Sequence, residues 1–122
     1  RTVITTLVPR LAYGHKWMLC LPSRGRVELQ ALWSSFAFDF VARQKLGGTS
    51  MSYSTMMQLA MPRPELIKSA ALPLDGPLSS WLCVRIDRLN AWIVDEPERA
   101  RVRAELDAAA FHLYGLDRQE VS

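Results

Sequence analysis

The sequence has few of the side chains that most often build metal centres and disulfide frameworks. It contains two cysteines and two histidines. A secreted disulfide scaffold has more cysteines at regular spacing, so we expect Cys20 and Cys83 to be buried free thiols in a reducing cytoplasm. His15 and His112 have no partner at ligand spacing, which argues against a zinc site. We therefore expect a cytoplasmic protein without a metal centre.

Long hydrophobic runs and catalytic motifs are missing as well. No apolar run approaches the roughly 20 residues that a membrane-spanning helix needs, so no membrane partner is expected. There is no glycine-rich phosphate loop followed by Lys and Ser or Thr, and no nucleophile elbow. Gly47-Gly48-Thr49 follows a predicted helix instead of a strand, which does not suit a nucleotide cradle. We expect no complete active site in this chain, and a small stand-alone enzyme is the least favoured alternative.

The composition allows one hydrophobic core and shows an uneven charge distribution. The chain has 122 residues, of which 49% are apolar, enough for a single small domain. Residues 1–68 contain nine Lys and Arg against three acids, and residues 69–122 contain six against nine. The first part therefore has the basic character that an acidic partner such as DNA would require, although it does not demand one.

The first 22 residues have the pattern of short strands. Thr2 to Val8 is rich in β-branched residues and is followed by Pro9, and the apolar run from Lys16 to Leu21 is followed by Pro22. This pattern predicts an antiparallel pair of strands joined by a loop. The predicted fold class is therefore α+β, with short antiparallel strands around a buried central helix and a helical hairpin at the C-terminal end.

A long apolar pattern from Val27 to about Lys45 predicts the central helix. Apolar residues recur at steps of three and four, with a second apolar face beside them, so we expect a mostly buried helix. The expected stripe consists of Leu29, Leu32, Trp33, Phe36 and Phe40, and the second face of Ala37, Phe38 and Val41. Asp39 and Arg43 are four residues apart and are expected to pair. Gly47-Gly48 is expected to end the helix in a left-handed conformation.

The second half of the sequence predicts helices. Residues 65–78 contain Pro73, Gly76 and Pro77 and are expected to form a linker-like passage. A helix from about Ser79 to Ile93 and a second one after the capping signal Asp95-Glu96-Pro97-Glu98 predict an antiparallel hairpin over residues 79–122. We expect residues 1–64, this passage and the hairpin to form one domain. The chain starts within what resembles a structural element, which suggests a piece of a larger protein.

One cluster of residues has the composition of a phosphate-contacting surface. The predicted helix ends in basic residues, followed by a glycine turn and a segment rich in hydroxyls. Arginine and lysine supply charge to phosphates, while hydroxyls and backbone N–H groups donate hydrogen bonds. A solvated loop at a helix end would have the same composition, so both interpretations stay open. The candidate residues for phosphate contact are Arg43 and Lys45, with Thr49 and Ser50 beside them, and Lys16, Arg24 and Arg26 as an extension of the patch.

Two segments of the sequence resemble a known protein family. They are FAFDFVARQKLGGTSMSYSTMMQLAMPRP, residues 36–64, and RAELDAAAFHLYGLDRQEV, residues 103–121. Both resemble the C-terminal region of bacterial N6-adenine DNA methyltransferases of the type IIG restriction-modification kind. In that family an aromatic helix with an Asp leads into Arg-Gln-Lys, Gly-Gly-Thr, a polar-aromatic stretch, Gln-Leu and a proline exit. This sequence has Ser52-Tyr53-Ser54 where the family commonly has an aromatic pair.

The resemblance implies a target-recognition region, the DNA-binding specificity module of a larger enzyme. It implies double-stranded DNA as partner, together with an upstream methyltransferase domain that binds S-adenosylmethionine and carries the catalytic Asn-Pro-Pro-aromatic motif. That motif does not occur here, so the implied cofactor belongs to the parent protein and none is expected in this chain. The alternative is a structural or protein-interaction domain that docks on the methyltransferase core.

Overall fold

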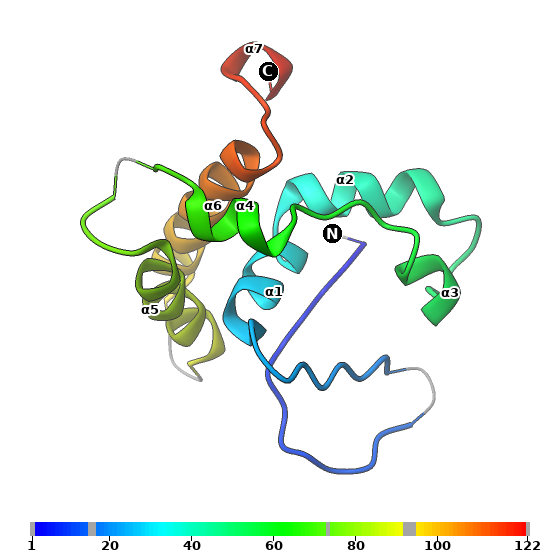
Figure 1. The fold of residues 1–122 in the computed structure, drawn as a ribbon. Helices are drawn as coiled ribbons and strands as arrows, with labels where there is room; N and C mark the ends of the chain where they lie inside the picture. The colour runs from blue at the N-terminus through cyan, green and yellow to red at the C-terminus, as the bar shows by residue number, and fades with distance from the viewer. Residues whose placement is uncertain (1, 15–16, 73, 92–94, 122) are drawn as a thin grey trace.

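The structure is a computed structural model that describes residues 2–14, 17–72, 74–91 and 95–121. Its described residues form helices joined by loops (Figure 1). In chain order these are α1 (Arg26–Trp33), α2 (Phe36–Lys45), α3 (Tyr53–Met56), α4 (Pro64–Ser69), α5 (Leu78–Asn90), α6 (Glu96–Leu113) and α7 (Arg118–Val121).

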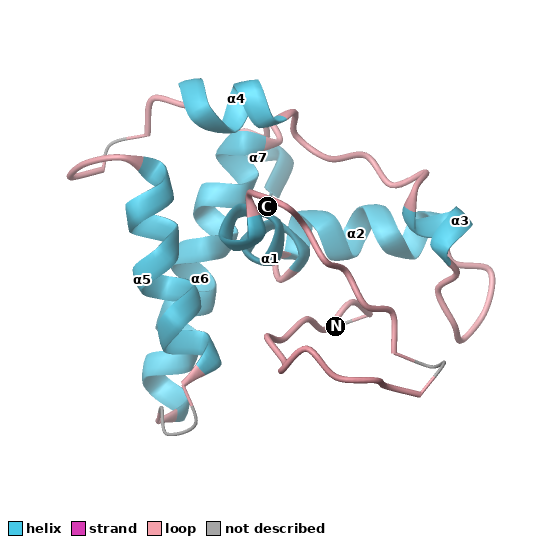
Figure 2. Cartoon of the chain, turned by 60° about the horizontal axis from the view of Figure 1, so that its bottom comes forward, coloured by secondary structure: helices cyan, strands magenta, loops and turns pink. Residues whose placement is uncertain are grey.

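No strand occurs among these described residues, so the predicted α+β class with antiparallel strands is wrong (Figure 2). A strand needs the backbone groups of a neighbouring strand as partners. Here the backbone N–H groups of Thr2 and Val3 donate to the Asp39 carboxylate in α2. The Thr5 hydroxyl lies 2.8 Å from that of Ser34. The N-terminal segment is therefore held against the α1–α2 pair by side chains instead of by a sheet.

The predicted central helix is broken into two helices at Ser34 and Ser35. Ser35 Oγ accepts a hydrogen bond from the Phe38 N–H and donates one to the Leu32 carbonyl, so that this side chain caps α2. A serine that bonds to nearby backbone favours such a new helix start. The single helix from Val27 to Lys45 was therefore a wrong prediction.

The break also changes which aromatic side chains are buried. Phe38 is completely buried, whereas Phe36 and Phe40 are 52% and 65% exposed. The expected stripe assumed one uninterrupted helical register, and the new start at Ser35 turns Ala37, Phe38 and Ala42 inward instead. The same expectation of burial is wrong for the cysteines, because Cys20 is an exposed free thiol and Cys83 is half-buried.

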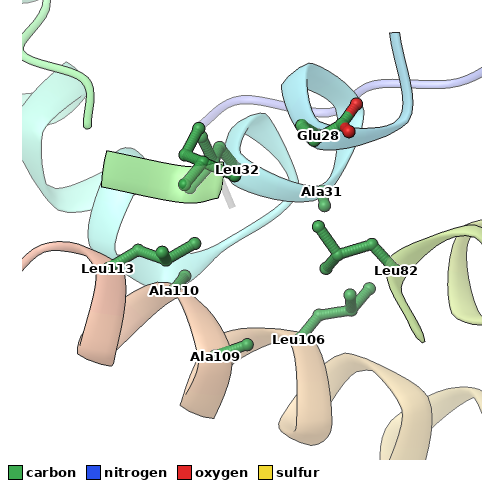
Figure 3. Close-up of a pocket in the computed structure, with 9 residues that line it drawn as sticks. Glu28, Ala31, Leu32, Leu82, Leu106, Ala109, Ala110 and Leu113 are labelled. Carbon is green, nitrogen blue, oxygen red and sulfur yellow. The ribbon is translucent and has the colours of Figure 1, made fainter. Parts of the chain in front are cut away.

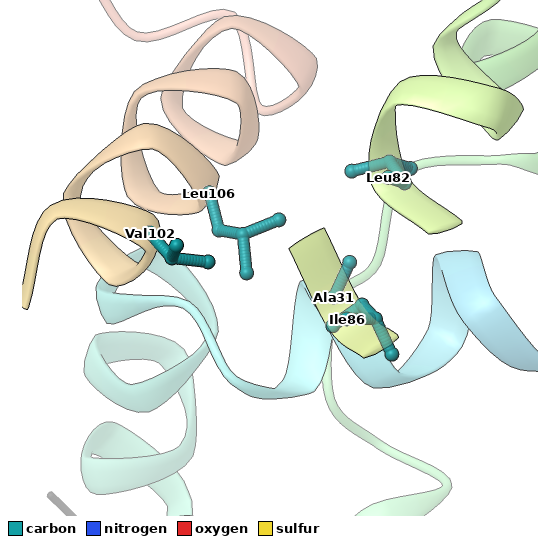
Figure 4. Close-up of a cluster of buried hydrophobic side chains, with 5 residues drawn as sticks. All are labelled: Ala31, Leu82, Ile86, Val102 and Leu106. Atoms are coloured by element: carbon teal, nitrogen blue, oxygen red, sulfur yellow. The ribbon is translucent and has the colours of Figure 1, made fainter. Parts of the chain in front are cut away.

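The main core lies where α1 crosses the α5–α6 hairpin (Figure 4). Leu82, Ile86, Val102 and Leu106 of the hairpin surround Ala31 of α1, and each is at most 4% exposed. The two hairpin helices occur close to where the sequence predicts them, although α5 ends at Asn90 and Ile93 lies outside the described residues. Helix α4 covers the first part of the passage that was expected to be a linker. The core thus joins residues from both halves of the chain.

Two smaller clusters extend this core. Leu32, Ala110 and Leu113 pack together, and Phe38, Ala42 and Leu59 form another cluster under α2. The space between α1, α5 and α6 is filled by apolar side chains and leaves a void of about 10 Å³ (Figure 3). Such a void has room for about one water molecule, so this interior holds no ligand site.

Candidate nucleic-acid interface

The end of α2 presents the first group of candidate residues. Arg43 and Lys45 lie in the last turn of the helix, Thr49 and Ser50 follow in the loop, and all four side chains are exposed. The helix ends because Leu46 adopts an extended conformation with φ −76° and ψ 111°. Gly47 and Gly48 do not have positive φ, so the predicted left-handed cap is wrong. A side chain at either glycine would meet open space, which leaves the loop accessible.

Arg43 has a structural role in addition to any contact with a partner. Its Nε lies 2.9 Å from Asp39 Oδ2 and donates to the Thr2 hydroxyl at 2.8 Å. This confirms the expected pair of Asp39 and Arg43. The Arg43 side chain is still 56% exposed, so the guanidinium contacts the N-terminal segment on one side and remains open to solvent on the other.

Asp39 is buried and its charge is compensated within the fold. The N–H groups of Thr2 and Val3 donate to its Oδ1 at 2.5 and 2.8 Å. Burial by itself would raise the pKa of Asp39, but these two hydrogen bonds and the Arg43 charge outweigh burial and hold the pKa below its usual value. Asp39 therefore stays ionised and does not act as a proton donor or acceptor near neutral pH.

Lys45 is the least constrained cation at this helix end. Its side chain is exposed, and it forms no ion pair with any residue that the structure describes. The flexible lysine side chain can change its conformation to bind a phosphate, and it breaks no ion pair within the described fold when it does so. A change of charge at Lys45 therefore breaks no ion pair among the described residues.

The second group of candidate residues lies at the start of α1. Arg24 and Arg26 are exposed on either side of Gly25, whose φ of 71° favours glycine. They line an open hollow of about 540 Å³ together with the start of α5. Ser79 and Ser80 lie in this hollow and are residues that the sequence argument missed, because nothing in the sequence indicates that α5 starts beside α1. Glu28 lies in the same hollow and lowers its positive charge.

The structure does not bring the predicted residues into one patch. Arg24 precedes α1 and Arg26 begins it, whereas Arg43 and Lys45 end α2, and these are opposite ends of the α1–α2 pair (Figure 1). Lys16 lies outside the described residues. The candidate interface therefore consists of two separate basic points, the α2 exit and the hollow beside Arg24.

Among the described residues, no group of three His, Cys, Asp or Glu side chains could hold a metal ion. No helix of the described part is long and apolar enough to cross a membrane. No protein-family model, curated protein or solved structure matches this chain.

Proposed function

We propose that this chain is the DNA-binding specificity module of a larger restriction-modification adenine methyltransferase. The proposal is carried by one observation: the segment that resembles this family, residues 36–64, also contains the exposed basic exit of α2. Lysine, arginine and hydroxyl side chains at such a position suit contacts with the DNA backbone. Enzymes that methylate adenine in DNA extrude the base from the duplex, so a second region that grips the DNA has a mechanical purpose.

The state of the acidic residues supports this proposal. Residues 1–68 contain three acids, Glu28, Asp39 and Glu65. The buried Asp39 is compensated by Arg43 and by two backbone N–H groups. The pair of Asp39 and Arg43 adds no net charge, so the basic character of this surface comes from cations without a described ion pair, among them Lys45, Arg24 and Arg26. Phosphates of a duplex would meet Lys45 at the α2 exit and Arg24 and Arg26 in the hollow, where Glu28 is the opposing carboxylate.

In this proposal S-adenosylmethionine belongs to the upstream methyltransferase domain of the parent protein. The chain itself would position the DNA, and methyl transfer would take place in the upstream domain. The loop with Thr49 and Ser50 would donate hydrogen bonds beside Lys45, and the hydroxyls of Ser79 and Ser80 would do so beside Arg24. Two separate contact points fix the orientation of a duplex better than one, because a single point leaves it free to rotate.

Fluorescence anisotropy with a labelled DNA duplex tests this proposal. Phosphate contacts release counterions, so we expect binding that weakens as salt is raised. The triple variant Arg24→Gln/Arg26→Gln/Lys45→Gln should weaken binding and reduce the dependence on salt. Arg43 is left in place because its loss would also disturb Asp39 and the N-terminal segment.

The matched control removes three positive charges from the other half of the chain. Arg88→Gln/Arg101→Gln/Arg118→Gln changes exposed arginines outside both contact points. Because Arg88 and Arg101 pair with Glu98 and Glu105, circular dichroism first checks that this variant is folded. Binding that does not depend on salt, or that falls equally in both triple variants, would count against specific contact through the α2 exit and the hollow.

A protein-interaction domain is the second candidate function, and the exposed apolar residues favour it. Large apolar side chains in the first 21 residues are exposed, including Ile4 at 84%, Leu11 at 66% and Trp17 at 59%. Exposed apolar surface of this kind often marks contact with another protein. Calorimetric titration of the chain with the separately produced methyltransferase domain tests this alternative. Leu11→Ser/Trp17→Ser should abolish binding there, and unchanged binding would reject this surface as the contact.

A further inference from the structure

We propose that a cleft between the N-terminal segment and helices α1, α5 and α6 binds a mononucleotide. The cleft has a volume of about 430 Å³ and is lined by residues 3–6 and by side chains of all three helices. Sites for small molecules usually have volumes of roughly 300–1,000 Å³. This cleft is separate from the α2 exit and from the hollow beside Arg24, so the proposal does not depend on the proposed function.

Two arginines give the cleft its charge. Arg99 and Arg103 lie four residues apart on α6 and therefore on the same side of the helix. None of the described residues that line the cleft is acidic. One turn beyond Arg103 on α6, the Asp107 carboxylate accepts a hydrogen bond from the Phe36 N–H. Guanidinium groups bind phosphate through two parallel hydrogen bonds, which makes such a pair suitable for a phosphate group.

The contacts of Arg99 within the protein are long for an arginine so well covered. Its side chain is 25% exposed, yet its Nε lies 3.8 Å from a Glu96 carboxylate that is itself 82% exposed. Its other contact with a residue that the structure describes is with the Leu89 carbonyl at 3.4 Å. A partly buried charge is costly without a close counter-charge. An anion in the cleft would supply that counter-charge.

Arg85 is a comparable arginine whose charge is compensated within the fold. Its side chain is 21% exposed, similar to Arg99, but its Nε lies 2.6 Å from Glu105. Its guanidinium also lies 3.5 Å from the centre of the Trp81 ring. Arg85 is thus compensated by neighbouring side chains. The comparison indicates that Arg99 has room for an external anion.

The remaining walls suit a base and a sugar. Gln30 and Asn90 bond to each other through their amides, at 2.8 Å in one direction and 3.2 Å in the other. An amide NH₂ carries two N–H groups, so each residue keeps one donor for the edge of a base. Leu89 and Ile4 supply apolar surface, and the hydroxyls of Thr5 and Ser34 lie along the same cleft. A free phosphate would contact only the arginines, whereas a mononucleotide would also contact the amide, hydroxyl and apolar side chains of these walls.

Adenosine 5′-monophosphate is the probe for this site, and adenosine and inorganic phosphate are the two comparison ligands. Isothermal titration of the whole chain should show saturable binding of the nucleotide, with both comparison ligands at least about tenfold weaker. Arg103→Gln should weaken nucleotide binding by about tenfold or more, because it removes a charge-assisted contact. Arg103 is exposed and forms no ion pair with a described residue, so this variant should still fold.

Arg101→Gln is the matched control. Arg101 lies two residues from both cleft arginines and so on a different side of α6, where it pairs with Glu105. Its substitution removes the same charge and should change nucleotide binding less than about twofold. The proposal is overturned if the folded chain does not bind the nucleotide, if phosphate binds as tightly, or if the two variants lose affinity equally. Loss of DNA binding in the triple variant with Lys45→Gln tests the other proposal and does not bear on this one.

Discussion

The backbone N–H of Phe36 donates a hydrogen bond to Asp107 Oδ1 at 2.7 Å, and so joins the start of α2 to α6. Asp107 is 6% exposed, although it carries a carboxylate. The first N–H groups of a helix have no partner within the helix, and a buried carboxylate satisfies one of them here. This contact, together with the Ser35 cap, fixes the point where the long apolar pattern breaks into two helices.

Replacing Asp107 with alanine should destabilise the fold. The change leaves the Phe36 N–H without this charged acceptor, which typically costs roughly 1–3 kcal/mol of unfolding free energy. Urea denaturation followed by circular dichroism measures the difference. Asp75→Ala, at an exposed loop position, should change the unfolding free energy by less than about 0.5 kcal/mol. Equal effects of the two substitutions would contradict a structural role for Asp107.

Replacing Ser35 with alanine removes the cap of α2. Its Oγ accepts from Phe38 and donates to the Leu32 carbonyl. Loss of such a cap typically lowers the unfolding free energy by about 1 kcal/mol. Ser23 precedes α1 but makes no cap there, since Gly25 holds that position. Ser23→Ala is therefore the control, and thermal unfolding should show a lower midpoint for Ser35→Ala alone.

The changed register of α2 predicts opposite outcomes for two phenylalanines. Phe38 is completely buried, so Phe38→Ala should lower the unfolding free energy by roughly 3–5 kcal/mol. Phe40 is 65% exposed, so Phe40→Ala should cost less than about 0.5 kcal/mol. Denaturation curves of the two variants compare them directly. A large loss of unfolding free energy in Phe40→Ala would instead support the single continuous helix that the sequence predicted.

Asp39 should make the stability of the protein sensitive to acid. Its pKa is lowered in the folded state, because the hydrogen bonds and Arg43 outweigh burial, so the unfolded chain takes up a proton first as the pH falls. The stabilisation from the ionised carboxylate is therefore complete above the usual value of 3.8 and is lost as the pH falls below it towards the folded-state value. Urea denaturation from pH 6 down to acid should show a steeper loss for the natural protein than for Asp39→Asn. Parallel curves would contradict this assignment.

Tyr114 should titrate late at alkaline pH. Burial raises the pKa of its phenol to about 12, and its hydroxyl donates to the Ala60 carbonyl at 3.0 Å. The raised pKa means that the unfolded chain loses this proton first, so the contribution of Tyr114 to stability is complete below pH 10 and falls as the pH rises towards 12. The absorbance of tyrosinate measures this titration. Tyr114→Phe should remove the phase near pH 12, and a spectrum that keeps that phase would assign it to another group.

Local sequence signals predicted the hairpin of α5 and α6 well. The regular spacing of Leu82, Ile86, Val102 and Leu106 depends on neighbours in the chain, and these four residues are buried in the structure. Asp95 holds the N-cap position of α6 as expected, but its side chain makes no capping hydrogen bond. The N-terminal strands were predicted from β-branched residues alone. A strand also needs a partner strand, and the N–H groups of Thr2 and Val3 find the Asp39 carboxylate instead. Such a distant partner has no signal in the local sequence.

For the candidate sites too, some features follow from the sequence and others only from the tertiary structure. The sequence by itself determined which residues are basic, that charge gathers in the first 68 residues, and that Asp39 and Arg43 pair one helical turn apart. Only the tertiary structure decided that Arg24 and Lys45 lie at opposite ends of the α1–α2 pair and that Arg99 shares a cleft with Gln30. The reason is physical: composition and helical spacing act over a few residues, whereas the break at Ser35 and the packing of α1 on α5 and α6 depend on contacts between distant residues.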